Sequence, residues 1–375
     1  MNITLFFTYG VSLKTWHKSG LLQREVKIYH KLMEKYGVEV QFLTYGGVDD
    51  REIESELHGI KLLPVYERLS RPRFKIIALL QSLFIPFYFR KEIKKTDILK
   101  SNQIWGGWTP VLAKWLFKKP LLVRCGYELY DFALKSDKNN FYKWFVYLIS
   151  WMSYKSADRV HVATNQDKDF VIDRFKIKSS QIHVFPNWID IKEYRPLKNV
   201  LNNKESILFV GRLNKQKNIL LLLKALSGTR ISLDIAGDES LKKTLEIEAI
   251  KLDVTVNFLG SIPNDKMPEI YNQYDIFVLC SKYEGNPKVL LEAMACGCSV
   301  VGTNVSGINN IIHNGVDGVL VEETAEDLRN GICTLRNNPV LRKHIMKNAR
   351  EHIIVHHSLE AALDKEYSTY KILVS

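Results

Sequence analysis

The organisation of this chain is clearest at Asp275-Ile-Phe-Val-Leu-Cys280 and the residues after it, Ser281-Lys-Tyr-Glu-Gly-Asn-Pro-Lys-Val-Leu-Leu-Glu-Ala-Met-Ala295. The first six residues form a short apolar run typical of a buried strand, and those after Pro287 are good helix formers. We predict that Asn286 caps the helix and that Pro287 is its first residue, where a missing N–H costs nothing. Gly297 fits the left-handed position beyond the helix end. Residues 275–297 are therefore predicted to form a strand, a loop and a helix.

Two carboxylates lie eight positions apart in this segment, Glu284 in the loop and Glu292 inside the helix. Free N–H groups and the positive end of the helix make the loop a site for anions. A carboxylate there would repel a phosphate unless it faced another group, such as sugar hydroxyls. The layout suits a sugar nucleotide, which has phosphates in the middle and hydroxyls at both ends. Taken alone, this spacing is better explained by two solvated surface acids, because the pattern is short and acidic residues are common.

Further apolar runs end in glycine turns or polar residues. Gly211, Arg212 and Lys217 follow one run, and two cations at the carboxyl end of a parallel strand suit a diphosphate. With helical patterns between them, these runs predict a doubly wound parallel sheet in the second half of the chain, with ligands outside the carboxyl ends of its strands. The predicted strands lie in 207–210, 232–236 within Ser232-Leu-Asp-Ile-Ala-Gly-Asp-Glu239, 254–259, 299–303 and 318–321.

These segments resemble glycosyltransferase family 4, which comprises retaining enzymes of the α/β GT-B fold with two doubly wound Rossmann-like domains facing each other across a cleft. The resemblance covers about residues 183–325 in order and spacing. The motifs that carry it are Pro186-Asn-Trp-Ile-Asp190, Gly211-Arg-Leu-Asn-Lys-Gln-Lys217, Ala236-Gly-Asp238, Phe258-Leu-Gly260, the block from Glu284 to Glu292, and Gly315-Val-Asp-Gly318.

The resemblance implies roles for individual residues. Arg212 and Lys217 would bind the donor diphosphate, Glu284 the hydroxyls of the donor sugar, and Glu292 the ribose. Arg212, Lys217 and Glu284 are the predicted catalytic residues. No metal and no cofactor are expected, because the two cations and the helix end would neutralise the leaving diphosphate; the co-substrate is a nucleotide-diphosphate sugar, UDP- or GDP-linked. The full predicted donor site is Gly211, Arg212, Lys217, Gly237, Asp238, Gly260, Ser261, Ile262, Glu284, Gly285, Asn286, Pro287, Lys288, Val289 and Glu292.

The first half of the chain has the same alternation of strand and helix patterns. Strand patterns occur at 2–7, 38–44 and 120–125. A helix is predicted from about Gly20 to Tyr36, with one apolar face made by Leu22, Val26, Tyr29 and either Leu32 or Met33. The residues from Gly10 to Gly20 are predicted to form a long loop, which resembles the flexible acceptor-side loop of the family.

The chain departs from the family after the strand at 120–125. Many relatives carry a histidine there that helps to orient the donor sugar, whereas this chain has Arg124-Cys-Gly-Tyr127. Arg124 or the backbone at Gly126 is a possible substitute, and Gly20, Arg124, Gly126 and Tyr127 are the predicted acceptor-side residues. His17 either reaches the cleft or is solvated, and His161 is predicted to pack structurally.

Pro186 and Pro196 mark the predicted connection between two domains. We predict an acceptor-binding domain at 1–183, a linker at 184–196 and a donor-binding domain at 197–355. The resemblance further implies that a final helix within 356–375 returns to the first domain.

The composition is that of an ordinary globular protein, with 46% apolar and 25% charged residues in 375 positions. Five scattered cysteines without a C-x2-C pair argue against a disulfide framework or a zinc site. Cys296 and Cys298 are expected to pack at the helix end. The first residues lack a secretory signal pattern, so a cytoplasmic location is expected.

Positive charge is concentrated in the first half, where residues 1–190 contain 30 Lys and Arg against 19 Asp and Glu. The segment 71–91 places the apolar run 76–89 between basic flanks, and 141–151 is rich in aromatic residues. A run of this length is too short to span a bilayer. Both segments are either core-packing helices or elements that lie on the anionic inner leaflet of a membrane.

The sequence therefore predicts a retaining, metal-independent glycosyltransferase that acts on a glycan or a lipid-linked acceptor, in polysaccharide, lipopolysaccharide or cell-envelope biosynthesis. It is expected in the cytoplasm or on the cytoplasmic face of the membrane. The alternatives are another GT-B enzyme, such as an epimerase or a phosphorylase, and a non-catalytic basic binding protein. A nucleic-acid partner is not expected, because no RNA-binding or helix-turn-helix pattern is present.

Overall fold

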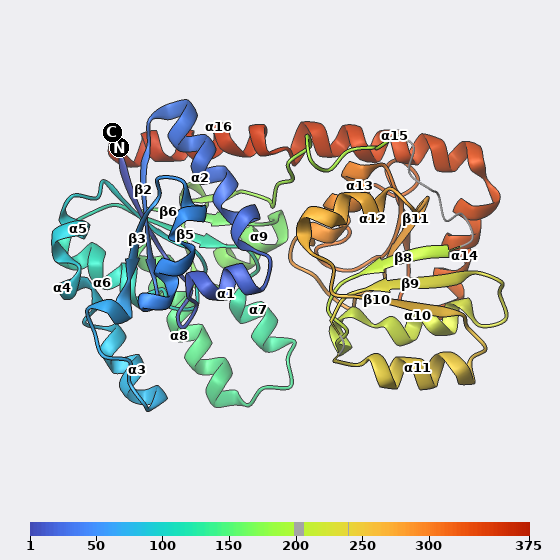
Figure 1. Cartoon of the computed structure of the whole chain (residues 1–375), viewed down its shortest axis with the longest axis horizontal. Coiled ribbons are helices and arrows are strands. Elements are labelled where there is room, and N and C mark those ends of the chain that lie inside the picture. The colour runs from blue at the N-terminus through green and yellow to red at the C-terminus, as the bar shows by residue number, and fades with distance from the viewer. Residues whose placement is uncertain (199–205, 239) are drawn as a thin grey trace. The chain divides into compact units, whose positions relative to one another are not determined.

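The chain folds into two compact units, residues 1–185 with 363–375 and residues 186–362 (Figure 1). This computed structural model describes residues 1–198, 206–238 and 240–375. Residues 199–205 of the predicted donor domain and Glu239 of the quoted motif lie outside the described residues. Each unit is a parallel sheet with helices around it, so the predicted class, α/β with two Rossmann-like domains, is confirmed.

The first unit is built on a seven-stranded parallel sheet with the order β3-β2-β1-β4-β5-β6-β7. Its strands are β1 Asn2–Phe6, β2 Glu39–Thr44, β3 Lys61–Pro64, β4 Ile98–Ser101, β5 Leu121–Cys125, β6 Arg159–Val162 and β7 Ile182–Val184. Its helices are α1 Leu13–Lys18, α2 Leu22–Tyr36, α3 Lys75–Ser82, α4 Ile85–Tyr88, α5 Arg90–Lys94, α6 Trp108–Phe117, α7 Leu129–Leu134, α8 Asn140–Ser156 and α9 Asn165–Phe175, with 3-10 turns η1 Val48–Leu57, η2 Val65–Glu67 and η3 Ser179–Gln181.

The last helix, α16 (Leu359–Val374), contributes residues 363–375 to the first unit. Glu366 on this helix and Lys100 on β4 form a fully buried ion pair. Tyr367 stacks on Tyr36 of α2 with ring centroids 3.7 Å apart. These contacts cover one face of the first sheet with the carboxyl end of the chain.

The second unit is built on a six-stranded parallel sheet with the order β10-β9-β8-β11-β12-β13. Its strands are β8 Ser206–Val210, β9 Ser232–Ala236, β10 Val256–Gly260, β11 Ile276–Leu279, β12 Ser299–Thr303 and β13 Val319–Val321. Its helices are α10 Ile219–Leu226, α11 Lys242–Lys251, α12 Met267–Tyr271, α13 Lys288–Cys296, α14 Ala325–Asn337 and α15 Pro339–His356, with 3-10 turns η4 Lys215–Lys217 and η5 Asn264–Lys266.

The strand order of the second sheet places the functional loops. β8, β11 and β12 are buried along their whole length, as expected for central strands covered on both faces. The chain runs outward from β8 to β9 and β10 on one side, whereas β11 pairs with β8 on the other side. The order therefore reverses between β8 and β11, and a crevice for ligands is expected outside their carboxyl ends.

The predicted loop from Gly10 to Gly20 is wrong, because α1 occupies most of it. The Ser12 hydroxyl accepts a hydrogen bond from the Thr15 backbone N–H at 3.1 Å, and Thr15 reciprocates toward the Ser12 N–H, which is a capping box. The helix predicted to follow is confirmed as α2, and its predicted apolar face is buried.

Core packing, one of the two alternatives for the apolar segments, holds on only one side of each segment: Ile85 and Phe89 of the first segment are buried in the core. In α3 only Ser82 is buried, and Ile76 is 74% exposed. In α8 Val146 and Ile149 are buried, but Phe141 is 73% exposed. Among the described residues, no helix combines the length and the apolar character needed to cross a membrane.

Candidate functional site

Two glycines bring the loops after β8 and β9 together. Gly211 has a φ of +155°, which L side chains rarely adopt. A Cβ at Gly237 would lie 2.0 Å from the carbonyl oxygen of Gly211. The Gly211 N–H donates to the Ala236 carbonyl at 2.9 Å, so the two turns are held at the edge of the sheet. A side chain at position 237 would force them apart.

The loop after β8 and the loop after β11 meet through an ion pair. Lys217 Nζ lies 2.5 Å from Glu284 Oε1, and both side chains are about one-tenth exposed. The Ser281 hydroxyl donates to the same oxygen at 2.5 Å. The structure therefore brings together a predicted diphosphate-binding cation and a predicted sugar-binding acid, each with exposure left for a ligand.

Backbone contacts hold this pair in place. The Gln216 side-chain amide donates to the Tyr283 carbonyl at 2.8 Å, and the Lys282 N–H donates to the Gln216 carbonyl at 2.9 Å. The Glu284 N–H donates to the Ser306 carbonyl at 2.9 Å, and a Cβ at Gly307 would lie 2.5 Å from the Glu284 carbonyl oxygen. Three loops thus form one interlocked rim at the carboxyl ends of β8, β11 and β12.

The predicted cap of α13 is wrong. The helix begins at Lys288 with Pro287 as the residue before it, and no side chain caps its N-terminus. The Asn286 side-chain oxygen instead accepts from the Asn187 N–H at 2.9 Å, and the Asn187 amide donates to the Asn286 carbonyl at 2.6 Å. Because Asn286 is occupied elsewhere, the first N–H groups of α13 have no side-chain cap. Gly297 ends the helix with a φ of +85°, as predicted.

Glu292 lies deeper than Glu284, with 2% of its surface exposed. The Tyr271 hydroxyl on α12 donates to Glu292 Oε2 at 2.9 Å. Burial, followed by the nearby Glu292 charge, raises the pKa of Tyr271 well above its ordinary value, so this hydroxyl stays a donor. Tyr271 is a site residue that sequence reasoning missed, because 21 positions separate it from Glu292.

The other predicted donor residues surround this rim. Arg212 and Ser261 are exposed, and Ser261 donates to the Gly237 carbonyl at 3.3 Å. Asp238 organises its own turn by accepting from the Leu213 N–H at 3.2 Å and from the Ser240 hydroxyl at 2.7 Å; the Ser240 bond lowers the pKa of Asp238. The remaining members are partly buried at loop ends or at the start of α13: Gly260, Ile262, Gly285, Lys288 and Val289.

The predicted acceptor-side residues lie in the first unit. Arg124 on β5 has a side chain only 11% exposed and pairs with Glu25 of α2 at 3.7 Å, so its guanidinium is held inside the fold. The Gly126 N–H donates to the Gln103 side chain at 3.0 Å, Tyr127 is 40% exposed, and Gly20 is exposed in the turn between α1 and α2. The structure therefore places Arg124, Gly126 and Tyr127 together at the end of β5, and Gly20 in a separate turn.

Two histidines of the first unit that the sequence analysis considered, His17 and His161, have structural partners. His17 lies on α1 and its Nε2 is 3.1 Å from Glu56. His161 is buried, stacks on Phe185 with centroids 4.7 Å apart, and its Nε2 is 3.1 Å from the Thr369 hydroxyl. The structural role predicted for His161 is confirmed. Cys296 and Cys298 are buried beside the end of α13, also as predicted.

Glu128 is a second residue that sequence reasoning missed. Its side chain is completely buried next to Tyr127, accepts from the Asp131 N–H at 2.5 Å and accepts from the Tyr154 hydroxyl at 3.0 Å. Burial raises the pKa of Glu128 to about 7. A carboxyl group that titrates near neutrality thus lies beside the predicted acceptor side. No spacing in the sequence distinguishes it from an ordinary helix cap.

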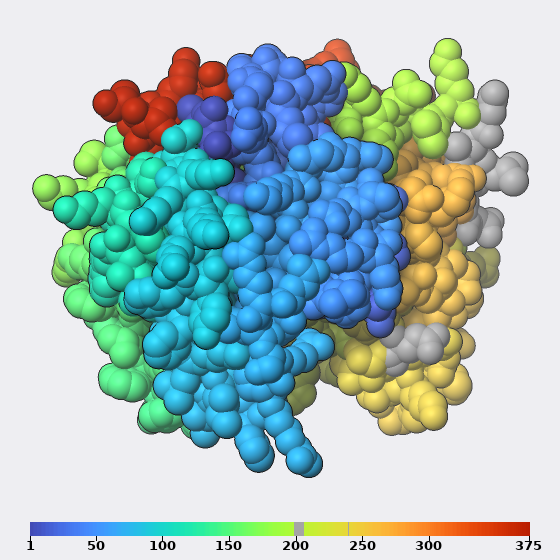
Figure 2. Space-filling model, turned by 60° about the vertical axis from the view of Figure 1, so that its left-hand side comes forward, coloured from blue at the N-terminus to red at the C-terminus, as the bar shows by residue number. Residues whose placement is uncertain are grey.

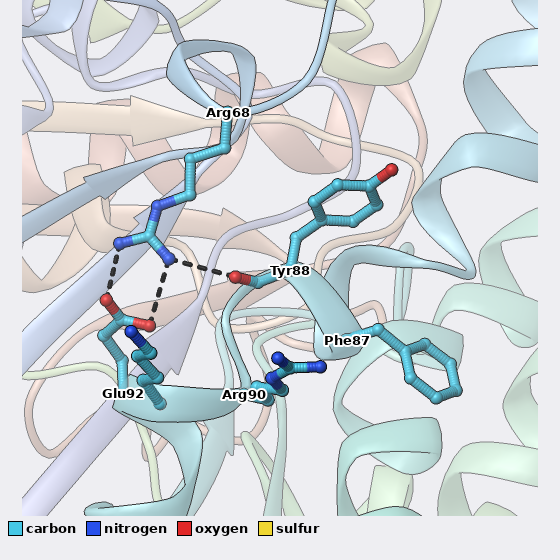
Figure 3. A pocket seen from close by; sticks show the side chains of 6 residues that line it. Arg68, Phe87, Tyr88, Arg90 and Glu92 are labelled. Carbon is cyan, nitrogen blue, oxygen red and sulfur yellow. Dashed lines mark hydrogen bonds and ion pairs between the residues drawn. The ribbon is translucent and has the colours of Figure 1, made fainter.

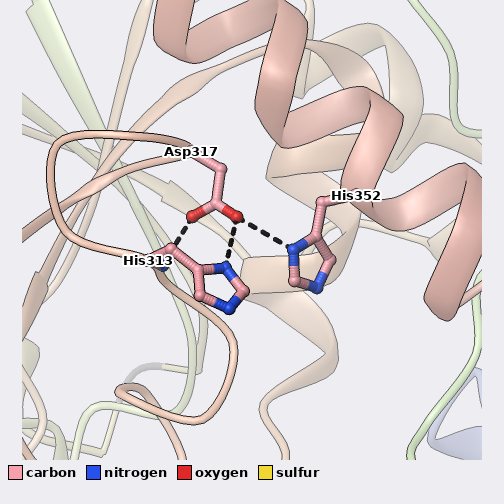
Figure 4. Close-up of side chains that lie close together, drawn as sticks. All are labelled: His313, Asp317 and His352. Atoms are coloured by element: carbon pink, nitrogen blue, oxygen red, sulfur yellow. Dashed lines mark hydrogen bonds and ion pairs between the residues drawn. The ribbon is translucent and has the colours of Figure 1, made fainter.

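One cluster has the residue types of a metal site (Figure 4). Asp317 accepts from His313 Nδ1 at 2.7 Å, from the His313 N–H at 2.6 Å and from His352 Nδ1 at 2.9 Å. The possible ligand atoms of the three residues lie within 4.8 Å of one another. The carboxylate is already satisfied by hydrogen bonds that join the turn before β13 to α15. The turn precedes its strand, so the cluster lies at the edge of the sheet opposite the donor loops.

Comparisons with known proteins agree with this fold. The family model Glycosyltransferase Family 4 matches residues 29–193, and the model Glycosyl transferases group 1 matches residues 190–352. A curated relative from Escherichia coli, UDP-Gal:alpha-D-GlcNAc-diphosphoundecaprenol alpha-1,3-galactosyltransferase, is 28% identical over 312 residues, covering 76% of this chain and 78% of the relative.

A Campylobacter jejuni relative, N-acetylgalactosamine-N,N'-diacetylbacillosaminyl-diphospho-undecaprenol 4-alpha-N-acetylgalactosaminyltransferase, is 30% identical over 222 residues, covering 57% of this chain and 60% of the relative. The matched regions cover 66%, 78% and 63% of three curated relatives, so the chain spans about two thirds of their length.

Solved structures share the fold. The Anabaena protein Alr3699/HepE in complex with UDP and glucose has a TM-score of 0.78 at 16% identity, covering 99% of both chains. The two family models meet at residues 190–193 and together match residues 29–352, so this chain belongs to the glycosyltransferases of the GT-B fold, with a family 4 domain followed by a group 1 domain.

Proposed function

We propose that this protein transfers a sugar from a UDP- or GDP-linked donor to a lipid-linked acceptor during synthesis of a polysaccharide, lipopolysaccharide or other cell-envelope glycan. The observation that carries the proposal is the Lys217–Glu284 pair at the switch point of the second sheet, 2.5 Å apart and with about one-tenth of each side chain exposed. The Escherichia coli and Campylobacter jejuni relatives are named as transferases that act on diphosphoundecaprenol-linked sugars, which supports the acceptor class.

The charges at this rim fit the departure of a diphosphate. Cleavage of the bond between the anomeric carbon and the phosphate oxygen leaves negative charge on the diphosphate. Lys217, the exposed Arg212 and the uncapped N-terminus of α13 supply fixed positive charge for it. Binding of the diphosphate would draw Lys217 away from Glu284, and Glu284 would then accept hydrogen bonds from sugar hydroxyls.

We propose that the reaction retains the anomeric configuration. The acceptor oxygen would form its bond to the anomeric carbon on the face that the diphosphate leaves, and the acceptor proton would pass to a phosphate oxygen. The balance closes, with the glycoside and a nucleoside diphosphate as products. Because two side chains and a helix end supply the neutralising charge, we propose that no metal is needed.

Incubation of the protein with UDP- and GDP-sugars and an undecaprenyl-diphosphate-linked sugar tests the proposal. We expect release of nucleoside diphosphate with and without EDTA, and an NMR coupling constant of the new linkage that matches the donor anomer. An inverted product would refute retention, and loss of turnover in EDTA would refute metal independence. The absence of turnover with every donor would refute the transferase assignment of this site.

We further propose that the protein works on the cytoplasmic face of a membrane as a peripheral protein. A lipid-linked acceptor is held in a bilayer, and the excess of basic residues in positions 1–190 would attract an anionic leaflet.

A further inference from the structure

The segment formed by α3 and α4 exposes large apolar side chains in a continuous run. Each such side chain forgoes the free energy that burial of its apolar surface would supply, so contiguous exposed apolar surface marks an interaction site. Figure 2 shows the α3 part of this segment projecting from the first unit. Six side chains that are at least half exposed define its apolar face: Phe74, Ile76, Ile77, Leu80, Phe84 and Phe87.

The opposite side of this segment is firmly packed. Ile85 and Phe89 are buried in the core of the first unit. The buried Ser82 hydroxyl accepts from the Trp108 indole N–H at 2.8 Å, which ties the end of α3 to α6. The apolar face is therefore presented to the outside by an anchored element, and its exposure is a property of the fold.

Cations flank the apolar face at both ends. Arg71 and Arg73 precede it, Lys75 lies beside its first residue, and Arg90 and Lys91 follow it; all five are exposed. The last two line an open pocket of about 710 Å³ together with Arg68, Phe87, Tyr88 and Glu92 (Figure 3).

The charges inside this pocket leave a net positive site. Arg68 donates to Glu92 Oε1 at 2.5 Å and to Glu92 Oε2 at 3.1 Å, and also to the Tyr88 carbonyl at 3.0 Å. Glu92 is thereby neutralised. Arg90 and Lys91 form no ion pair with any other described residue, so two cations lie beside the exposed rings of Phe87 and Tyr88.

A second apolar stripe lies on α8. Phe141, Trp144, Leu148 and Trp151 are all more than 40% exposed, and their spacing places them on one side of the helix. In Figures 1 and 2, α3 and the start of α8 extend to the same end of the first unit. Because α3 follows β3, and α8 follows β5 and α7, this end is the carboxyl edge of the first sheet.

We propose that the α3–α4 face, together with the stripe on α8, docks on an anionic lipid bilayer. The apolar and aromatic side chains would enter the boundary between headgroups and acyl chains, and Arg90 and Lys91 would bind lipid phosphates. Charge complementarity favours this occupant, because cations stand at both ends of the apolar face. The inference rests on the proposed function only in that a lipid-linked acceptor lies in the same bilayer.

Vesicle flotation of the full chain tests the docking face. We expect binding to phosphatidylcholine vesicles that contain 30% phosphatidylglycerol, at least about tenfold stronger in 50 mM than in 500 mM salt because screening weakens the phosphate contacts. The double variant Leu80→Asp, Phe84→Asp should lose at least about tenfold in binding, because two charges at the acyl boundary cost several kcal/mol. Ile250→Asp, at a site 81% exposed in the second unit, is the matched control and should bind normally.

A second double variant tests the two cations that line the pocket. Arg90→Gln with Lys91→Gln should remove most of the preference for anionic over neutral vesicles, whereas Lys343→Gln with Lys347→Gln on α15 should preserve it. Circular dichroism of each variant would show an intact fold. Trp144 fluorescence, isolated by Trp→Phe changes elsewhere, should be quenched by brominated lipids.

The outcomes separate the two proposals. Wild-type protein that binds nucleotide but no anionic vesicle would overturn the docking face and the proposed peripheral location, and it would leave the proposed sugar transfer standing. Vesicle binding without any nucleotide binding would support the docking face and overturn the proposed sugar transfer. A concentration-dependent dimer that Leu80→Asp abolishes, without vesicle binding, would assign the face to a second copy of the chain and overturn the bilayer as its occupant.

Discussion

The ammonium group of Lys217 lies 2.5 Å from Glu284 Oε1, although 67 positions separate the two residues. The pair links the loop after β8 to the loop after β11, where the strand order of the second sheet reverses. Under the proposed function, an anionic ligand there would meet the Lys217 cation, and Glu284 would turn to hydroxyl groups of the donor. The contact itself holds the two loops together.

Lys217→Ala should abolish donor turnover while the protein stays folded. The change removes a cation from the diphosphate site and leaves Glu284 largely buried without its ion-pair partner, a loss of about 3 kcal/mol in the free energy of unfolding. Turnover and urea denaturation measure the two effects. Lys215→Ala, an exposed lysine in the same 3-10 turn, is the control and should behave as wild type. Near-normal turnover in Lys217→Ala would refute the assigned role.

Gly237→Ala should weaken donor binding through the backbone alone. The new Cβ would lie 2.0 Å from the Gly211 carbonyl oxygen, so the two turns must separate, at a cost of about 1–3 kcal/mol. Gly228→Ala is a useful comparison: its φ is +73° but no atom lies within 4 Å of the new Cβ, so only backbone strain of about 1 kcal/mol is expected, without loss of donor affinity. Equal donor affinities in both variants would contradict the close approach.

Glu128 should make stability depend on pH in the neutral range. Its pKa rises from 4.5 to about 7 on burial, so the unfolded chain releases this proton at lower pH than the folded protein. Its contribution is fully present below pH 4.5 and is lost as the pH rises through 7, by up to about 3 kcal/mol. Denaturation midpoints of wild type and Glu128→Gln between pH 4 and 8 should therefore diverge, with the flatter profile in the variant. Parallel profiles would exclude Glu128 as the titrating group.

Asp317→Asn should destabilise the second unit at pH 7 by about 1–3 kcal/mol, because the carboxylate joins the turn before β13 to α15. Burial alone would raise the pKa of Asp317, but the hydrogen bonds from His352 and His313 lower it overall. Its stabilising contribution is therefore present above the ordinary aspartate pKa and is lost as the pH falls through the lowered value. Thermal denaturation at pH 7 and pH 3 should show the difference between variant and wild type shrinking in acid.

The same three residues allow a metal test. If hydrogen bonds alone satisfy Asp317, the melting temperature should be the same in EDTA and in micromolar zinc. A rise in zinc that Asp317→Asn abolishes would show that His313, Asp317 and His352 hold a metal.

Local patterns in the sequence identified most of the second sheet. β8, β9, β11 and β12 are short buried runs that end in turns, and Gly297 carries the left-handed φ expected beyond a helix. These features depend on neighbours in sequence. Ser12 and Thr15 form a capping box, a local pattern that indicates the start of α1. Few apolar residues follow them, so the sequence predicts a loop there.

Features that depend on distant residues were beyond sequence reasoning. Asparagine is a common helix cap, so Asn286 is a natural candidate from sequence. In the structure, however, Asn187, 99 positions away, donates hydrogen bonds to both the side-chain oxygen and the backbone carbonyl of Asn286. An apolar run such as 76–89 does not reveal whether its side chains face the core or the outside. The partners of the two carboxylates are likewise distant in sequence: Lys217 lies on another loop than Glu284, and Tyr271 lies on another helix than Glu292.

Calorimetric titration with UDP, GDP, ADP and their common sugars measures the central claim, that a pyrophosphoryl group binds between Lys217 and the start of α13. We expect at least one of these nucleotides to bind the wild-type protein, and Lys217→Ala to lose at least about tenfold in affinity, equivalent to about 1.4 kcal/mol. Nucleotide binding that is unchanged in Lys217→Ala, or no binding of any of these nucleotides, would contradict the account.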